Sequence, residues 1–217
     1  KPEAAKASQK AFIVNRIADA GFIMALMLIW REYGDFDFPY RLATNASWLT
    51  HFLIGLGLFV GAIGKSAQFP FQVWLPDAMA GPTPVSSLIH AATMVAAGVY
   101  LLLSVEPIFV PEMKLVIASV GAFTALIAAI SALTQTDIKR VLAYSTVSQL
   151  GFMVMGIGVG ASTFALLHLI AHAFFKCGLF LVAGAVIHGI HKAQDQEHLH
   201  FDAQDMRFMG GLRRRMP

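Results

Sequence analysis

Long apolar runs alternate with short polar connectors along this chain. Six runs, each about twenty residues or longer, cover residues 11–30, 49–73, 84–105, 114–134, 138–160 and 162–189. A helix needs about twenty apolar residues to cross a hydrocarbon core of roughly 30 Å. Hydrocarbon offers no partner to unpaired backbone groups, which favours helices, and the short alternating segments typical of membrane strands do not occur. The pattern therefore predicts an all-α, polytopic transmembrane helix bundle.

Prolines interrupt this pattern after the second run. Lys65 lies deep in that run and is followed by "SAQFPFQVWLP", which contains Pro70 and Pro76. Proline lacks a backbone donor and clashes with the preceding helical turn, so a plain continuous helix is not expected beyond Lys65. We predict a broken helix, in which freed carbonyl groups and a wet pocket are tolerated. Pro82 and Pro84 then open the third run, which we expect to be one helix.

The composition excludes several classes of protein. Hydrophobic residues make up 57% of the 217 positions and charged residues 13%, whereas about a quarter of a soluble domain is charged. The formal net charge of +3 therefore does not indicate nucleic acid, and no such partner is expected. A single cysteine, Cys177, excludes a disulfide framework and a cysteine metal cluster. There is no GxGxxG, P-loop, CxxC or haem signature, so we expect no cofactor bound by this chain.

The basic residues between the runs predict an orientation. If six spans alternate, the side of the N-terminal tail receives Lys1, Lys6, Lys10, Lys139, Arg140, Lys192, Arg207, Arg213, Arg214 and Arg215, and the other side receives Arg31, Arg41 and Lys114. Loops rich in lysine and arginine stay in the cytoplasm or its organellar equivalent, so we expect both ends there. Residues 1–190 would form the membrane core, and 191–217 a polar loop on the cytoplasmic side.

The chain is expected to be a piece of a longer protein. It lacks an initiator methionine. Residues 1–10 have neither the apolar core nor the small-residue cleavage site of a signal peptide.

Several ionisable residues fall inside the predicted spans. A charged side chain at the bilayer centre costs about 2.5–3.5 kcal/mol on insertion scales, so such residues usually face the protein interior or a wet cavity. Arg16 and Asp19 are three positions apart on one helical face and can form an ion pair. The alternative to a functional role for this pair is an ordinary salt bridge near the membrane surface.

Lys65 and His90 are the candidates for proton exchange. Burial disfavours the charged form of a lysine and a nearby carboxylate favours it, so a lysine with a changeable partner can take up and release a proton. A static ion pair or a snorkelling lysine is the alternative for Lys65. Imidazole titrates near neutral pH, although a lone buried histidine is often a packing residue. The neighbouring broken helix favours a functional His90.

His168, His172 and Lys176 form a series in the last run. Their spacing of four residues places them on one helical face, over about 12 Å of rise. Such a series predicts a path along which protons step through bridging water. A metal-binding histidine pair is the alternative, but only Asp19 and His90 offer further ligands and a lysine disfavours a cation. We expect no metal, including at the tail histidines 191, 198 and 200.

A basic pair opens the fifth run. Lys139 and Arg140 are consistent with interfacial anchoring, and Lys139 is also a supporting charge for the buried groups. A polar stretch able to hold water or to bond between helices follows. It consists of Tyr144, Ser145, Thr146, Ser148 and Gln149.

Three long segments carry a family resemblance. They are "GKSAQFPFQVWLPDAMAGPTPVSSLIHAATMVAAGVYL", "QTDIKRVLAYSTVSQLGFM" and "HLIAHAFFKCGLFLVAGAVIH". Together they closely resemble the large distal antiporter-like subunit of proton-pumping NADH:quinone oxidoreductase, respiratory complex I (subunit L or chain 5). The resemblance covers essentially the whole chain and implies a fragment spanning the sixth to eleventh transmembrane helices. It also implies a further lysine-bearing broken helix downstream.

The resemblance implies roles for the buried groups. Lys65 matches the lysine of the first broken helix, which in that family pairs with a glutamate from upstream, and Asp19 matches an acidic residue on the helix before it. His90 matches a histidine of the central hydrophilic axis. The axis continues at positions that match His168, His172 and Lys176. The implied function is proton translocation, driven by quinone reduction elsewhere in the complex.

The same resemblance implies cofactors, partners and a location. FMN, iron–sulfur clusters and quinone belong to the whole complex, and the partners are its other membrane subunits, including a neighbouring antiporter-like subunit, with lipids and protons. The expected location is the bacterial inner membrane, with the mitochondrial inner or thylakoid membrane as alternatives. The large subunits of Mrp-type sodium/proton antiporters are similar too, but Gln72 and Ala96 stand where they often have histidine and lysine. The residues also leave open a structural anchor and a metal-dependent membrane enzyme.

Overall fold

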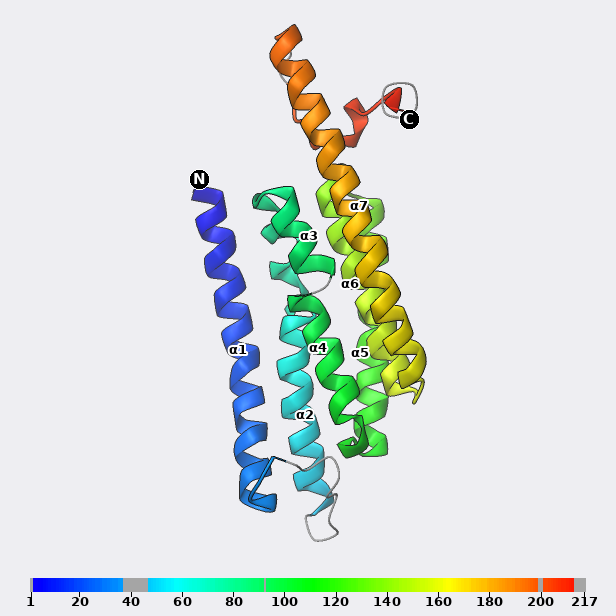
Figure 1. Ribbon diagram of the computed structural model, residues 1–217. Coiled ribbons are helices and arrows are strands. Elements are labelled where there is room, and N and C mark those ends of the chain that lie inside the picture. The colour runs from blue at the N-terminus through cyan, green and yellow to red at the C-terminus, as the bar shows by residue number, and fades with distance from the viewer. Residues whose placement is uncertain (1, 37–46, 92, 199–200, 213–217) are drawn as a thin grey trace.

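The computed structural model describes residues 2–36, 47–91, 93–198 and 201–212, and these residues are almost entirely helical. The α-helices in chain order (Figure 1) are α1 (Pro2–Tyr33), α2 (Trp48–Lys65), α3 (Thr83–Ala91), α4 (Met94–Val105), α5 (Pro111–Leu133), α6 (Ile138–Gly158) and α7 (Ser162–Glu197). The described residues also form four short 3₁₀ helices, namely η2 (Phe71–Trp74), η3 (Asp77–Ala80), η4 (Glu106–Ile108) and η5 (Met206–Phe208). Within these described ranges there is no β-strand.

Among the described residues, six helical segments are long and apolar enough to cross a membrane, with α3, α4 and η4 counted as one. This confirms the predicted all-α transmembrane bundle. Two ends differ from the expected ones. Helix α1 begins at Pro2 rather than near residue 11, and α7 continues to Glu197. Residues 191–197, predicted as part of a loop, are therefore helical. This end of α7 projects from the bundle (Figure 1), where polar side chains are exposed.

The helical path is broken twice, and only one break was expected. Helix α2 ends at Lys65, and the chain then passes through η2 and η3 instead of continuing as a helix to residue 73. The peptide bond between Phe69 and Pro70 is cis. The second break separates α3, which ends at Ala91, from α4, which begins at Met94 after Thr93. The span predicted over 84–105 falls within the candidate membrane span Thr83–Ile108, but it consists of two helices rather than one. Neither proline nor glycine marks the break between them.

Side chains take up the backbone groups that the first break frees. The Trp74 indole donates to the Gly64 carbonyl at 3.1 Å, and the Thr124 hydroxyl accepts from the Phe69 N–H at 3.1 Å. Ser66, the residue after α2, donates to the Val95 carbonyl in the first turn of α4 at 2.8 Å. These bonds replace backbone hydrogen bonds that a continuous helix would make. Lipid hydrocarbon has no group that could replace them.

Glycines bring α1 and α2 into close contact. A Cβ atom on Gly57 would lie 2.6 Å from the Gly21 carbonyl oxygen, and one on Gly64 would lie 2.2 Å from the Ala18 Cβ. Both distances are shorter than atoms tolerate. Small residues at membrane helix interfaces allow such close backbone approach. The contact fixes the end of α2, where Lys65 lies, against the middle of α1.

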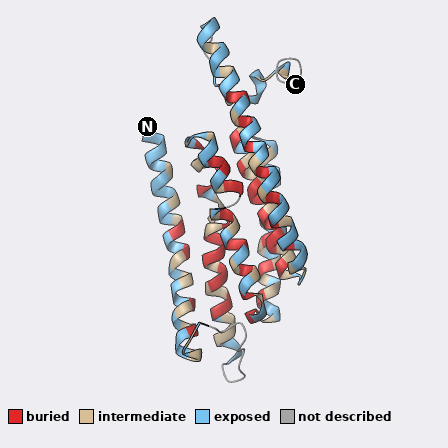
Figure 2. Cartoon of the chain, viewed as in Figure 1, coloured by how far each residue is buried: buried red, intermediate tan, exposed pale blue. Residues whose placement is uncertain are grey.

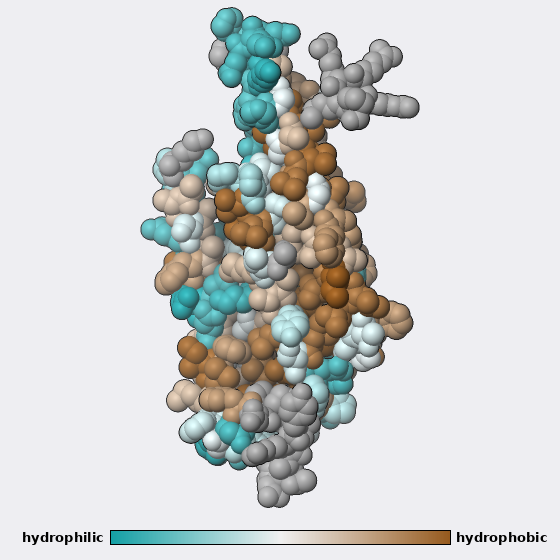
Figure 3. All heavy atoms as spheres, viewed as in Figure 1, coloured by the Kyte–Doolittle hydropathy of each residue, from teal (hydrophilic) through white to brown (hydrophobic). Residues whose placement is uncertain are grey.

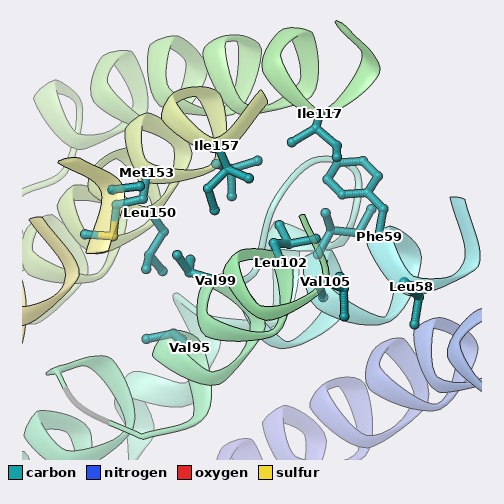
Figure 4. Packing of buried hydrophobic residues seen from close by; sticks show 14 of the residues in the cluster. Leu58, Phe59, Val95, Val99, Leu102, Val105, Ile117, Leu150, Met153 and Ile157 are labelled. Carbon is teal, nitrogen blue, oxygen red and sulfur yellow. The ribbon is translucent and has the colours of Figure 1, made fainter. Parts of the chain in front are cut away.

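The apolar core lies between α2, α4, α5 and α6. Figure 4 shows side chains of these helices meeting, among them Phe59, Leu102, Ile117 and Leu150, each at most 2% exposed. Helix α1 is mostly exposed, whereas α2 and α6 carry many buried residues (Figure 2). Apolar side chains also cover much of the outer surface around the middle of the molecule (Figure 3), as expected for a surface that faces lipid or other membrane helices.

The N-terminus and the C-terminal segment lie at the same end of the bundle (Figure 1). There the segment after α7 pairs with the connector between α5 and α6. The Ile138 N–H donates to the Gln204 carbonyl at 3.0 Å, and the Met206 N–H donates to the Thr136 carbonyl at 2.9 Å. Hydrogen bonds from Arg207 lower the pKa of the Asp205 carboxyl beside this connection.

The sidedness of the membrane stays a prediction. Part of the charge bias on which it depends comes from Lys1, Arg41, Arg213, Arg214 and Arg215, which lie outside the described residues.

The close approach of α1 and α2 gives a first prediction. Gly64→Ala in the full-length protein forces a methyl group into Ala18, and overpacking of this kind costs about 1–3 kcal/mol. We expect a lower thermal unfolding midpoint in detergent or nanodiscs. The control is Gly178→Ala, because no atom lies within 4 Å of a Cβ there and alanine stabilises a helix by up to about 1 kcal/mol relative to glycine. Equal midpoints for the two variants would contradict the packing argument.

Candidate functional site

Lys65 pairs with Asp19 across the contact between α1 and α2. The Lys65 Nζ lies 2.8 Å from Asp19 Oδ1, and the Arg16 Nε lies 3.6 Å from Asp19 Oδ2. The expected pair between Arg16 and Asp19 is thus present, but Asp19 also faces Lys65. Lys65 ends α2, so its cation lies at the negative end of the helix dipole.

Lys65 is less buried than the sequence predicted. Its side chain is 33% exposed and that of Asp19 is 20% exposed. In this chain by itself Lys65 lies at the margin of the α1–α2 contact, because α2 ends there. Its position deep in a membrane span stays a prediction.

A second group of titratable side chains lies between α3 and α7. His90 and His172 are fully buried, and Lys176 is 1% exposed. We call these three residues the buried row. Helix α3 lies against α7 (Figure 1), and the Ser87 hydroxyl lies 3.3 Å from the Cys177 Sγ between them. This contact places His90, near the end of α3, opposite the face of α7 that carries the other two members.

Phe180 lies between members of the row. Its ring centroid is 5.1 Å from that of His90, and the Lys176 Nζ lies 5.9 Å from it. A cation over an aromatic face is attracted by the ring quadrupole. The Lys176 Nζ also donates to the Ser145 hydroxyl of α6 at 2.9 Å. Sequence reasoning did not single out Phe180, although its position four residues after Lys176 places it on the same helical face.

Among the residues that the structure describes, four buried ring nitrogens have no hydrogen-bond partner. They are Nδ1 and Nε2 of both His90 and His172. A neutral imidazole has one donor and one acceptor nitrogen, and leaving such groups unpaired in an apolar interior costs free energy. Buried polar groups are usually satisfied by protein or by ordered water. The geometry therefore favours internal water beside these histidines.

The remaining predicted site residues lie around the row. His168 is half-buried, one turn before His172 on α7. Lys139 is 5% exposed and its Nζ donates to the Gly81 carbonyl at 3.2 Å. The Lys139 amine is therefore enclosed between α6 and the connector before α3. Its role as an interfacial anchor or as a supporting charge stays a prediction. Its neighbour Arg140 is exposed.

The structure does not join Lys65 directly to the row. In the part of the chain that the structure describes, no hydrogen bond or ion pair links Lys65 to His90. The two groups share one feature, because each contains a basic residue in the last turn of a helix that ends inside the bundle: Lys65 in α2 and His90 in α3.

The residues present do not form a metal or redox centre. Among the described residues, no group of three or more histidine, cysteine, aspartate or glutamate side chains could hold a metal ion; His200 lies outside them. An iron–sulfur cluster needs about four cysteine ligands, and the chain has one cysteine. The donor set of this chain therefore does not fit an iron–sulfur cluster.

Breaks beside Lys65 and His90 within a bundle of membrane-capable helices indicate the antiporter-like class of fold. Comparison with known proteins agrees with this class. The chain belongs to the family described as NADH:quinone oxidoreductase/Mrp antiporter, TM, whose profile matches residues 1–217.

Curated relatives from three different sources are about equally similar to the chain. It is 50% identical over 224 residues to NAD(P)H-quinone oxidoreductase chain 5 of Picosynechococcus sp., covering 99% of this chain and 33% of that protein. It is 50% identical to NADH-ubiquinone oxidoreductase chain 5 of Metridium senile (99% and 35%). It is 48% identical to NADH-quinone oxidoreductase subunit L of Rhodobacter capsulatus (100% and 31%). The chain thus spans about a third of the length of these relatives.

Solved structures of two membrane complexes contain a similar fold. One is the Mrp complex from Dietzia sp., with a TM-score of 0.82 and 39% identity over 87% of this chain and 22% of that one. The other is the membrane-bound sulfane sulfur reductase, an archaeal respiratory membrane complex, with a TM-score of 0.73 and 27% identity over 86% of this chain and 40% of that one.

The position of the Lys65–Asp19 pair gives a second prediction. In a double-mutant cycle with Lys65→Gln and Asp19→Asn in the full-length protein, we expect a coupling of about 1 kcal/mol, read from thermal midpoints. The matched control is Lys10–Asp77, a pair at 2.6 Å whose side chains are 43% and 39% exposed. Water screens that pair, so its coupling should be smaller. Couplings of the same size for both pairs would show that the α1–α2 contact does not strengthen the Lys65 pair.

Proposed function

We propose that this chain is the central part of a proton-translocating, antiporter-like membrane subunit of an NADH:quinone oxidoreductase complex. Family membership and relatives named as subunits of such oxidoreductases support the proposal. The observation that carries it is the pair of fully buried histidines, whose ring nitrogens have no hydrogen-bond partner among the described residues and lie beside a buried lysine. Imidazole can both accept and donate a proton near neutral pH, which a proton path requires.

In this proposal Lys65 stores a proton and the buried row passes it on. Asp19 stabilises the charged amine of Lys65 at 2.8 Å, and a change in this contact alters how firmly the proton is held. His90, His172 and Lys176 then relay the proton through water, with His168 continuing the path on the same helix. Arg16 and Lys139 adjust the local field.

Electrostatic repulsion limits the row to few charges at a time. Phe180 contacts both His90 and Lys176, so a positive charge on one acts on the other across an apolar ring. Like charges at such separations repel strongly where water is scarce. A proton that arrives at one end of the row therefore favours release from the other end, which gives the path a direction once the two ends open in turn.

The energy source must lie outside this chain. Its single cysteine does not fit an iron–sulfur cluster, so FMN, the iron–sulfur clusters and quinone would be held by other subunits of the complex. A neighbouring antiporter-like subunit and lipid would cover its exposed apolar faces. The location would be the bacterial inner membrane, or its mitochondrial or thylakoid equivalent, with both ends on the cytoplasmic, matrix or stromal side.

A sodium/proton antiporter of the Mrp type is the second candidate function. The structural likeness to the Mrp complex, with a TM-score of 0.82, favours it. Transport that depends on sodium in vesicles would select this function, and transport that is independent of sodium would select proton translocation alone.

Removal of the buried amines gives a third prediction. In the assembled complex, Lys65→Met and Lys176→Met should each lower proton pumping about tenfold or more, because groups that transfer protons typically contribute at least that much. Pumping is measured as acidification of vesicles during quinone reduction. Lys192→Met is the matched control, because Lys192 is exposed on the same helix as Lys176, and it should pump normally.

The same variants separate the other classes of function. A purely structural role predicts loss of assembled complex rather than loss of pumping by intact complex. A metal-dependent role of His168 and His172 predicts stoichiometric metal in the purified protein. Unchanged pumping stoichiometry in assembled Lys65→Met complex would overturn the proposal.

A further inference from the structure

A charged hollow opens at the end of the bundle where the N-terminus lies. It has a volume of about 480 Å³ and is bounded by α1, η3, the connector before α6 and the segment after α7. Its charged lining includes Glu3, Lys6, Asp77, Asp137, Arg140 and Asp202. A hollow of this size with charged walls holds water. It is therefore an aqueous space that reaches into this end of the bundle.

The inner wall of the hollow is apolar. Met79 of η3 lines the hollow and is only 5% exposed. It packs with Ala143 of α6 and Phe180 of α7, both fully buried, in a cluster separate from the main core. We call Met79, Ala143 and Phe180 the apolar layer.

The apolar layer borders the buried row on its other side. Phe180 is the member that contacts the row, since its ring lies 5.1 Å from the His90 ring and 5.9 Å from the Lys176 amine. Met79 lines the hollow and Phe180 contacts His90, so the apolar layer lies between the hollow and the His90 imidazole.

A layer of this composition stops proton movement while it is closed. Its side chains have no group that accepts or donates a strong hydrogen bond, and narrow apolar constrictions close membrane pathways by excluding water. Lys139 lies one turn before Ala143 on α6 and is 5% exposed. Its enclosed amine adds repulsion against an incoming proton. Methionine is unbranched and flexible, so Met79 is a side chain that can withdraw without moving a helix.

We propose that Phe180, together with Met79 and Ala143, is a gate between the charged hollow and the buried row, and that the hollow is the aqueous port of the row. This inference rests on the proposed function, because a gate matters only if the row exchanges protons. When the layer opens, water joins the hollow to His90 and the row loads or unloads. When the layer closes, protons can move between members of the row but cannot leave it through the hollow.

The test uses the full-length protein in the assembled complex, reconstituted in vesicles. His90→Cys, with Cys177→Ser to remove the native thiol, serves as a reporter for the membrane-impermeant cation 2-(trimethylammonium)ethyl methanethiosulfonate. Adding Phe180→Ala opens the layer and should raise the labelling rate at position 90 at least about tenfold, which corresponds to about 1.4 kcal/mol off the free-energy barrier. The matched control is Phe174→Ala on the same helix, where the side chain is 77% exposed, and it should leave the labelling rate unchanged.

A second measurement leaves the row intact. Phe180→Ala alone should raise the passive proton leak of resting vesicles several-fold, and Met79→Ala should do so from the side of the hollow. Phe180→Leu keeps most of the apolar volume and should leak less than Phe180→Ala. If both assembled alanine variants show wild-type leak and wild-type labelling, the gate does not exist.

The outcome for the gate is independent of the outcome for the proposed function. Labelling reports access of a water-soluble reagent and does not require that the row carries protons. Faster labelling together with normal pumping by Lys65→Met would keep the gate and remove the proposed relay. Unchanged labelling and leak together with lost pumping by Lys65→Met would remove the gate and keep the relay.

Discussion

The need to satisfy backbone groups inside a water-poor interior shapes this structure more than any other constraint. A membrane helix can end within the bundle only where other parts of the protein take up the groups it frees. At the first break the Trp74 indole and the Thr124 hydroxyl do so, and at the second the Thr93 hydroxyl donates to the Leu88 carbonyl at 2.9 Å. These local bonds permit helix ends at membrane depth. Each such end in turn holds a basic side chain, Lys65 or His90, close to the negative end of a helix dipole.

The two basic residues then meet different surroundings. Close packing of α1 on α2 gives Lys65 a carboxylate partner at the margin of the bundle, whereas α7 gives His90 an aromatic ring and buried basic side chains. Side chains of the protein bond to backbone groups at both breaks, but in the described part of the chain the imidazoles of the row have no hydrogen-bond partner. Because of this contrast, we infer that water supplies the missing hydrogen bonds at the row and is not needed at the breaks. The apolar layer beside the row then matters for function, because it determines whether water at the row is connected to the water of the charged hollow.

The sequence predicted the helical bundle well because apolar runs of the right length leave no other structure for a membrane span. It also predicted a break after Lys65, because Pro70 and Pro76 exclude a continuous helix. It missed the break at Thr93, since "HAATMVAAG" has the composition of an ordinary apolar helix. It paired Arg16 with Asp19 from their spacing, but could not show that Lys65 reaches the same carboxylate. That contact depends on which face of α1 lies against α2. The glycines of α2 allow the close approach, but their partners on α1 can be identified only from the folded structure. Phe180 was missed because aromatic residues in apolar runs are common and its partner Met79 comes from a distant segment.

The central claim is that the buried imidazoles of His90 and His172 form hydrogen bonds to internal water. It is tested most directly by a high-resolution density map of the full-length protein in its complex, in a lipid environment. The account predicts ordered water within about 3.2 Å of the ring nitrogens of His90 and His172, continuing to the amine of Lys176. Dry apolar contact around both rings, with no water density between them and the lysine, would contradict it.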